Sequence, residues 1–403
     1  MGLKISFSSI VLLLLLTRVV EGQPGVFDVT KFGAKPDADI GPALVSAWKE
    51  ACASVTPSTI LIPKNNYALS QVLFEGPCKS SINFQIQGTV KASGDPSAFK
   101  ANGPGLPGWV TFEHVDLLTV SGGGTFDGQG ATAWSKNDCQ TNSNCAKLPI
   151  SLVFNFVTNS VAQDITSLNS KNFHLQVFGA DNMTVQHVTI TAPGDSPNTD
   201  GIHVGRSTKV TINDTQIGTG DDCISIGDGT QQLTIEKVTC GPGHGISVGS
   251  LGKFPEEKEV VGVFVRNCTL TNTLNGVRIK TWPASLPGSA SDMHFEDIIV
   301  NNVGNPVMID QEYCPSNQCS KKAPSRVKVS KVSFKNIKGT SSTQLAVKLL
   351  CSESIPCENV EVGDIDLAYS GPEGPPTTIC SNVKPIFSGK QNPPTCVGGS
   401  QSS

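Results

Sequence analysis

Alternating apolar pairs recur along the middle of this chain at a nearly constant interval, and this repeat restricts the folds available to it. In chain order the pairs are Ile202/Val204, Ile224/Ile226, Ile246/Val248, Val277/Ile279 and Val307/Ile309. Their spacings are 22, 22, 31 and 30 residues. A repeat of this length is one supersecondary unit that cannot bury its own apolar face, so successive units must stack on one another.

A second pattern recurs in the same part of the chain: apolar, any residue, apolar, two spacers, apolar, any residue, apolar. The segments that fit this template are Met183–Ile190, Val210–Ile217, Leu233–Cys240, Val263–Leu270, Met293–Val300, Val327–Phe334 and Val360–Leu367. Each coil should therefore hold two or three short strands, with like strands of successive coils parallel. We expect an all-β chain that forms a single parallel β-helix. A β-sandwich lacks this fixed phase, and a propeller needs four strands per blade.

The N-terminal end of the array is expected to carry a capping helix. The residues from Pro42 to Ala53 have helical spacing, with Leu44, Trp48 and Cys52 on one face. A stacked sheet exposes an unpaired edge at its end, and one amphipathic helix would cover that edge. The composition agrees, because 40 glycines and only 16% charged residues suit stacked strands better than a helical bundle.

The first residues have the features of a secretory signal. Lys4 is followed by the short apolar run Ile10–Leu16, and Val20–Gly22 offers a cleavage point. The alternative is a membrane anchor, but the run is too short to span a bilayer and Arg18 ends it early. We expect residues 1–22 to be a cleaved signal peptide and residues 23–403 to be one secreted β-helix domain that does not enter a membrane.

The 13 cysteines agree with an oxidising compartment. Close pairs that are disulfide candidates are Cys139/Cys145, Cys314/Cys319, Cys351/Cys357 and Cys380/Cys396. Zinc binding is the rival interpretation, but no Cys-x-x-Cys spacing with histidines supports it. Cys268 falls in an inward apolar position of the template, so we expect a buried free thiol. Candidate glycosylation sites, each at the start of an Asn-x-Ser/Thr sequon, are Asn182, Asn213 and Asn267.

The charge of the chain excludes one large class of partner. The net charge is −4, and no run of five or more Lys/Arg residues occurs. Binding of nucleic acid through a basic face is therefore not expected. An anionic substrate remains compatible with this balance, because the local charge at a site decides what it attracts.

Four short polar motifs lie beside the apolar pairs. They are Asn198-Thr199-Asp200, Gly220-Asp221-Asp222-Cys223, Gly243-His244-Gly245 and Arg278-Ile279-Lys280. Residues at the same phase of successive coils lie side by side, so these side chains should share one surface patch. Clustered carboxylates repel one another, which raises the pKa of at least one of them. One protonated and one ionised carboxyl group are what the hydrolysis of a glycosidic bond needs.

Other interpretations of these motifs stay open on chemistry alone. Asn-Thr-Asp-Gly and Gly-Asp-Asp are common turn sequences, and His244 could be a turn residue or could orient a carboxylate. Calcium binding is a third interpretation, but the aspartates lack accompanying loop oxygens at regular spacing. Arg278 and Lys280 alternate on a strand and face the same outward side. They could form a structural ion network with the aspartates or bind the carboxylates of a sugar acid.

The four motifs together resemble the signature motifs of the polygalacturonases, in the same order and at compatible spacing. The resemblance extends over nearly the whole chain after the signal, including Phe32–Lys35 and Ile60–Pro63, and is nearest to the plant pollen-type exopolygalacturonases. It implies a right-handed parallel β-helix and hydrolysis of α-1,4-linked galacturonan with inversion.

The resemblance also implies roles for individual residues. Asp221 corresponds to the general acid, Asp200 and Asp222 correspond to the pair that activates water, and His244 supports the acid. The residues that correspond to substrate-binding groups are Asn198, Arg278, Lys280 and, in Gln311-Glu312-Tyr313, Tyr313. Cys223 and Cys240 match a family disulfide, and Cys52 and Cys78 are also expected to be disulfide-bonded.

We therefore expect a monomeric enzyme of the extracellular space and cell wall that acts on de-esterified polygalacturonate without a metal ion or cofactor. Exo action from the non-reducing end is expected. Endo action is the alternative, because the mode depends on loops such as 253–259 and 283–291 that would close one end of the cleft. The rivals are a calcium-dependent pectate lyase, a rhamnogalacturonan hydrolase and a wall-binding protein without turnover. Arg278 and Lys280 favour a galacturonate, and the intact aspartates argue against a silent protein.

Overall fold

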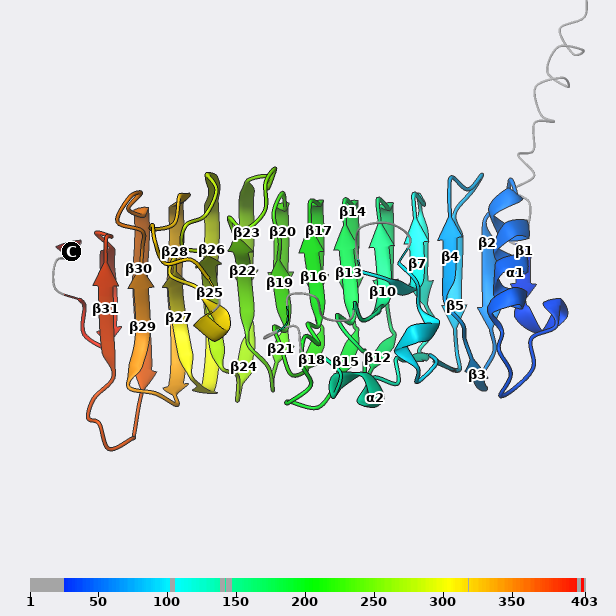
Figure 1. Ribbon diagram of the computed structural model, residues 1–403, viewed down its shortest axis with the longest axis horizontal. Coiled ribbons are helices and arrows are strands. Elements are labelled where there is room, and N and C mark those ends of the chain that lie inside the picture. Colours follow the sequence, from blue (N-terminus) through cyan, green and yellow to red (C-terminus); the bar gives the residue numbers. More distant parts are fainter. Residues whose placement is uncertain are drawn as a thin grey trace, which may run out of the picture.

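The computed structural model describes residues 25–101, 106–137, 142, 147–317, 319–396 and 400–401. Short strands stack coil upon coil along one long axis, with the N-terminal coils at one end and the C-terminal coils at the other (Figure 1). The strands of neighbouring coils pair in parallel from the first coil to the last. The predicted parallel β-helix is confirmed.

Two sheets run along the axis. The 11-stranded sheet consists of β4 (Val72–Glu75), β7 (Gly108–Glu113), β10 (Ile150–Asn155), β13 (Leu175–Phe178), β16 (Ile202–Gly205), β19 (Ile224–Ile226), β22 (Ile246–Leu251), β25 (Asn275–Thr281), β27 (Asn305–Asp310), β29 (Leu345–Leu350) and β31 (Thr377–Ser381). The 22-stranded sheet consists of β1 (Gly25–Asp28), β2 (Ser58–Ile62), β3 (Asn66–Ala68), β5 (Ile82–Ile86), β6 (Thr89–Lys91), β8 (Leu118–Ser121), β9 (Thr125–Asp127), β11 (Thr158–Gln163), β12 (Thr166–Leu168), β14 (Asp181–Gln186), β15 (Thr189–Thr191), β17 (Thr208–Asn213), β18 (Gln216–Gly218), β20 (Gln231–Glu236), β21 (Thr239–Cys240), β23 (Val260–Arg266), β24 (Thr269–Thr271), β26 (Gly288–Val303), β28 (Val327–Ser341), β30 (Glu358–Ala368), β32 (Ile386–Asn392) and β33 (Ser400–Gln401). The helical segments are α1 (Gly41–Ala53), α2 (Ala131–Trp134) and the 3-10 turns η2 (Val29–Phe32), η3 (Pro96–Ala98) and η4 (Pro315–Asn317).

The apolar pairs of the sequence repeat form consecutive strands of the 11-stranded sheet. Ile202 of β16 pairs with Ile224 of β19, which pairs with Ile246 of β22. Val277 of β25 and Val307 of β27 continue the same column. All of these side chains are fully buried in the core. The residue between the two apolar members of each pair therefore faces outward, and this outward row is where a site can form.

The eight-residue template marks the 22-stranded sheet, with one correction. Val210 pairs with Leu233 as predicted. For the segment Val327–Phe334 the predicted phase is wrong, because Val332 pairs with Met293, the residue that the template had aligned with Val327. The reason is that β26 and β28 are unbroken strands of 16 and 15 residues. The apolar alternation of these strands is longer than the eight-residue template, so the template can be placed on β28 from Val327 or from Val332.

The second spacer of each template bends the chain between two strands of a coil. With the template on β28 started at Val332, the residues at this position are His187, Asp214, Lys237, Asn267, Asp297, Asn336 and Asp364, with φ between 47° and 55°. This left-handed conformation is rare for residues other than glycine, and Asn and Asp are enriched in it. The two spacers thus form a tight corner that repeats from coil to coil.

The helix α1 covers the N-terminal end of the stack (Figure 1). Leu44, Ala47 and Trp48 are buried, and the Trp48 ring lies 4.9 Å from the ring of Phe74 between centroids. The indole N–H of Trp48 donates to the carbonyl of Glu75 at 3.1 Å. Burial of large apolar side chains of this kind contributes about 1.5–3 kcal/mol each. The predicted cap is confirmed.

The described cysteines agree with the predicted oxidation states. The disulfides are Cys52–Cys78, Cys223–Cys240, Cys314–Cys319, Cys351–Cys357 and Cys380–Cys396. Cys268 is a buried free thiol, as predicted, and its burial raises its pKa to about 12. The candidate pair Cys139/Cys145 and the predicted signal peptide, residues 1–22, lie outside the described residues. Within the described part of the chain, no helix is long and apolar enough to cross a membrane.

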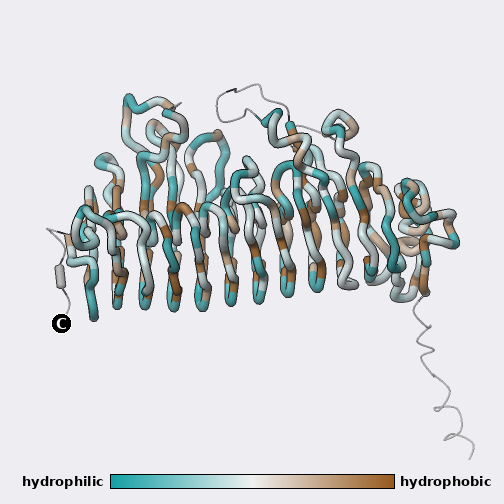
Figure 2. The backbone as a smooth tube through the Cα atoms, turned by 90° about the horizontal axis from the view of Figure 1, so that it is seen from below, coloured by the Kyte–Doolittle hydropathy of each residue, from teal (hydrophilic) through white to brown (hydrophobic). Residues whose placement is uncertain are grey.

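The turns that follow the strands of the 11-stranded sheet change length part-way along the axis. Those after β13, β16 and β19 are short, at residues 179–180, 206–207 and 227–230. Those after β22, β25 and β27 are long, at residues 252–259, 282–287 and 311–326. Seen from below, long turns stand above one side of the stack, whereas the opposite side is even (Figure 2).

Candidate active site

The four polar motifs meet at the 11-stranded sheet. Asp200, Asp222 and His244 each lie two residues before the first apolar residue of β16, β19 and β22. Because those strands are in register, the three residues occupy the same position in successive coils. The predicted convergence of the motifs is confirmed. Arg278 and Lys280 reach the same place from β25, the next strand of the sheet.

Glycines let the turns that carry this cluster pack closely. Gly245 has φ +87°, and a Cβ there would lie 2.2 Å from the carbonyl oxygen of Asn275. A Cβ on Gly220 would lie 2.1 Å from the carbonyl oxygen of Ser196. Both positions therefore require glycine. The Cys223–Cys240 disulfide joins the turn that carries the aspartate pair to the strand at the other side of the coil.

Asp222 is the most enclosed member of the cluster. Arg278 donates to its Oδ1 at 2.9 Å and Lys280 donates to its Oδ2 at 2.8 Å. The hydroxyl of Ser247 also donates to Oδ1 at 3.0 Å. The side chains of Asp222, Arg278 and Lys280 are only 2%, 10% and 8% exposed. Although burial opposes ionisation, Lys280 and Arg278 outweigh it and hold the pKa of Asp222 below its ordinary value.

Asp200 is shifted in the opposite direction. Its burial, followed by repulsion from Asp221 and Asp222, raises its pKa well above the ordinary value. This carboxyl group therefore holds its proton to a higher pH than a free aspartate does. The prediction that clustering raises the pKa of at least one carboxyl group is confirmed, and the environments of Asp200 and Asp222 shift their pKa values in opposite directions.

Asp221 is the more accessible carboxyl group of its pair. Its side chain is 18% exposed, and its Oδ1 lies 3.0 Å from Nδ1 of His244. The same oxygen accepts the backbone N–H of Asp222 at 2.8 Å. In turn the backbone N–H of His244 donates to the carbonyl of Asp221 at 2.8 Å. His244 is thus held against Asp221 by both its side chain and its backbone.

The remaining predicted site residues border this cluster. The ring of Tyr313 lies 5.1 Å from Lys280 Nζ and 5.8 Å from the guanidinium carbon of Arg278. Asn198, two residues before Asp200, accepts a hydrogen bond from the amide of Asn137 at 3.1 Å. Asn137 follows α2, so this segment approaches the cluster from the N-terminal side.

Sequence reasoning missed several polar neighbours of the cluster. Ser247 bridges Asp222 and the Arg278 Nε, which donates to it at 3.0 Å. The Ser225 hydroxyl lies 2.8 Å from His203 Nδ1 and is hydrogen-bonded to it. Ser225 also hydrogen-bonds Asp200, and this bond lowers the pKa of Asp200, against the effect of burial. The signal was present in the repeat, because these residues fill the outward position between the apolar pairs. That position faces the site in every coil from β16 to β25.

One group of residues among those described has the geometry to hold a metal ion. The ligand atoms of Asp221, Asp222 and His244 all lie within 4.8 Å of one another. Asp222 already has two cationic partners, Arg278 and Lys280, on its two oxygens. A divalent cation would have to compete with both of them, which makes the group a poor metal site.

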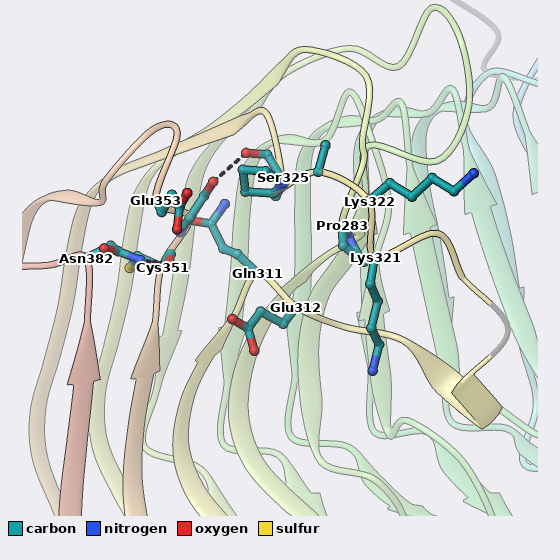
Figure 3. Close-up of a pocket in the computed structure, with 12 residues that line it drawn as sticks. Pro283, Gln311, Glu312, Lys321, Lys322, Ser325, Cys351, Glu353 and Asn382 are labelled. Carbon is teal, nitrogen blue, oxygen red and sulfur yellow. Dashed lines mark hydrogen bonds between the residues drawn. The ribbon is translucent and has the colours of Figure 1, made fainter.

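A cavity of about 440 Å³ opens on the C-terminal side of the cluster. Its charged lining residues are Glu312, Lys321, Lys322 and Glu353 (Figure 3). They come from the turn after β27, residues 311–326, and from the turn after β29, residues 351–357. Another cavity of about 640 Å³ lies on the N-terminal side and includes His203, Gln176 and Glu113. The cluster therefore stands between two hollows along the same sheet.

The chain resembles known proteins over this whole region. A family model described as glycosyl hydrolases family 28 matches residues 52–395. The chain belongs to this family. Members of the family that resemble it include a polygalacturonase from Nicotiana tabacum, 58% identical over 403 residues, which are 100% of both chains. An exopolygalacturonase from Platanus acerifolia is 56% identical over 377 residues, 93% of this chain and 99% of the relative.

Among solved structures, a hyperthermoactive exopolygalacturonase from Thermotoga maritima has a TM-score of 0.72 at 18% identity. The match covers 86% of this chain and 87% of that one. At this level of identity the likeness concerns the fold alone. Both chains form a right-handed parallel β-helix. Family membership makes the protein a glycoside hydrolase.

Proposed function

We propose that the protein is a secreted pectin hydrolase that cleaves the α-1,4-galacturonosyl linkages of polygalacturonate with inversion, from the non-reducing end. One observation carries the proposal: the three aspartates and His244 occupy one patch, beside the cations Arg278 and Lys280. Asp200 is held towards the protonated form and Asp222 towards the ionised form. Relatives named exopolygalacturonase, 56% and 58% identical, support the substrate and the exo mode.

In this proposal Asp221 donates a proton to the leaving glycosidic oxygen. It is more exposed than Asp222, so the sugar can reach it. The Nδ1 of His244 lies 3.0 Å from the Asp221 carboxyl group and can hydrogen-bond it while Asp221 carries the proton. After Asp221 has transferred that proton, the same contact stabilises the negative charge left on Asp221. Asp200 and Asp221 repel each other, and one proton shared between them relieves that repulsion.

Asp222 activates the attacking water, together with Asp200 once the shared proton has passed to Asp221 and from there to the leaving oxygen. Asp222 is the carboxylate that Arg278 and Lys280 keep ionised, which suits a general base. Water attacks the face of the sugar opposite the leaving group, so the configuration at the anomeric carbon inverts. Asn198, Tyr313, Arg278 and Lys280 are the proposed contacts to the sugar ring and its carboxylate.

We place the enzyme outside the cell, as a glycosylated monomer of the cell wall. The described disulfides agree with an oxidising compartment. The sequons at Asn182, Asn213 and Asn267 lie on or beside β14, β17 and β23 of the 22-stranded sheet, away from the site-bearing sheet. Attached glycans there would leave the aspartate cluster uncovered.

Product analysis on polygalacturonate tests the proposal, with wild type, Asp221→Asn and the control Asp364→Asn, each with and without chelator. Asp364 lies at a corner of the 22-stranded sheet, far from the cluster in the repeat. We expect monogalacturonate early in the reaction and no effect of chelator. Asp221→Asn should lose activity by about 10²–10⁴-fold because the general acid is removed, whereas Asp364→Asn should match wild type.

Other outcomes would point to the rival functions. A ladder of oligomers from the start would retain the hydrolase and replace exo action by endo action. Unsaturated products that require calcium would mean a lyase. A folded wild-type protein that releases nothing from polygalacturonate or rhamnogalacturonan would be a wall-binding protein.

A further inference from the structure

The cations of the cluster are too few to neutralise the carboxylates of a polyanionic substrate as well as those of the protein. Arg278 and Lys280 both bind Asp222, and little of either side chain is exposed. Their two positive charges face the three carboxyl groups of Asp200, Asp221 and Asp222, so the patch has no surplus of cations. A galacturonate unit brings a further negative charge into this patch. Its carboxylate needs another cation nearby, because bringing an uncompensated anion into a half-buried site is unfavourable.

Lys253 is the side chain placed to supply that charge. It is exposed, in the long turn at residues 252–259, and its Nζ lies 4.7 Å from the centre of the Trp282 ring. Among the described residues, no carboxylate lies within 4 Å of this Nζ. A lysine over an indole face is held by attraction to the ring while its charge stays available to an anion.

The turn that carries Lys253 is ordered by one carboxylate. Glu257 accepts the backbone N–H groups of Gly252, Lys253 and Phe254 at 2.6, 3.0 and 2.8 Å. The turn is also bonded to the next one, because the Leu286 N–H donates to the carbonyl of Gly252 at 3.0 Å. These bonds fix the backbone from which Lys253 projects, so its position does not depend on a mobile loop.

An aromatic bridge connects Lys253 to the cluster. The Trp282 ring lies 5.6 Å from the Tyr313 ring in an edge-to-face arrangement, and Tyr313 lies over Lys280. The indole N–H of Trp282 is buried and has no acceptor among the described residues. An unpaired buried donor of this kind is uncommon in a core and marks the position as more than packing.

We propose that Lys253, held over Trp282, binds the carboxylate of a galacturonate unit next to the scissile bond. Lys253 and Trp282 are then specificity-determining residues that favour de-esterified over methyl-esterified substrate. The inference rests on the proposed function. Lys321 and Lys322 are further cations on this side, but their cavity also contains Glu312 and Glu353, which offset them.

The test measures kcat and KM for wild type, Lys253→Met and Lys253→Arg on oligogalacturonate and on the same oligomer as its methyl ester. Lys258→Met is the matched control, since Lys258 is an exposed lysine of the same turn. Lys253→Met should raise KM for the acid about five- to tenfold, the loss expected for one charge-assisted contact, with kcat within about twofold. KM for the methyl ester should not change, and Lys253→Arg should retain the wild-type KM for the acid.

Thermal unfolding of each variant accompanies the kinetics, and because Lys253 is exposed we expect no change in Tm. An unchanged KM for the acid in Lys253→Met would overturn the inference while the proposed function stands. Equal increases for the acid and the ester would overturn it too, since the contact would then not read charge. If wild type itself fails to hydrolyse oligogalacturonate, the proposed function fails and the inference with it.

Discussion

The coils before and after the aspartate cluster are built from the same strand ladder but differ in their turns. From β13 to β19 the strands of the 11-stranded sheet are followed by turns of two to four residues, at 179–180, 206–207 and 227–230. From β22 to β27 the corresponding turns lengthen to 252–259, 282–287 and 311–326. The cluster lies where the short turns give way to the long ones.

The two regions contribute different parts of the site. The tight coils bring Asp200, Asp221, Asp222 and His244 together through backbone register alone, since equal coil lengths place equal positions side by side. The long turns add Lys253, Trp282 and Tyr313, and of these Tyr313 lies against the cations of β25. We therefore propose that the chemistry depends on the regular part of the fold and that selection of the substrate depends on its irregular part.

The largest expected effect comes from removing the anion at the centre of the tight region. Asp222→Ala leaves Arg278 and Lys280 buried without their partner, so the free energy of unfolding should fall by about 3–5 kcal/mol. Activity should fall by about 10²–10⁴-fold, because the proposed base is lost. Denaturant unfolding and polygalacturonate turnover measure the two effects.

The matched control is Asp366→Ala on the 22-stranded sheet. Asp366 pairs with Lys390 at 2.7 Å, but both side chains are well exposed. Such a surface pair contributes less than about 1 kcal/mol. Equal losses of stability in the two variants would contradict the picture of a buried charge network at the site.

A smaller effect, seen as a dependence on pH, is expected from Asp200→Asn. The folded protein raises the pKa of Asp200 above its unfolded value of about 3.9, so this group favours folding below about pH 4. That contribution is lost as the pH rises through the folded pKa. Asparagine does not titrate, so the Tm of the variant minus that of wild type should be more positive at pH 7 than at pH 4.

Thermal unfolding at the two pH values measures this difference. Lys280 and Arg278 lower the pKa of Asp222, so this group titrates below the interval from pH 4 to pH 7. A difference in Tm that does not vary with pH would mean that the proton is not held on Asp200.

The smallest expected effect concerns the order of the long turns. Glu257→Gln keeps one acceptor but removes the charge that binds the three N–H groups of residues 252–254. The free energy of unfolding should fall by about 1–2 kcal/mol, because charge-assisted hydrogen bonds become neutral ones. KM for polygalacturonate should rise modestly with kcat retained. A large loss of kcat would instead place this turn in the chemical step.

Much of the architecture could be predicted because it is periodic. The apolar pairs at Ile202, Ile224 and Ile246 predicted the column of strands that the structure contains. The same periodicity misled where strands are long, since Val332 and not Val327 pairs with Met293. Alternation repeats every two residues, so a strand longer than the template offers more than one phase that buries the same apolar face.

The site was predictable to the extent that it follows the repeat. The convergence of the motifs follows from coil length, whereas the partners of Arg278 and Lys280 do not. Sequence reasoning alone left open whether these cations form an ion network or bind a sugar acid. In the structure, Arg278 and Lys280 both donate hydrogen bonds to Asp222. Whether they also contact the substrate stays a prediction. Trp282 and Lys253 come from turns of different coils, and no periodic signal brings those turns together.

The sequence by itself determined the stacked fold, the cap and the set of residues that meet at one patch, because local apolar spacing sets strand register in a solenoid. Only the tertiary structure decided which carboxyl group has a raised pKa and which a lowered one. Burial and the distances to neighbouring charges set those pKa values, and the charges that interact are 21 to 80 positions apart in the chain. The contacts of the long turns were likewise decided in three dimensions, since their bonds join residues that share no repeat.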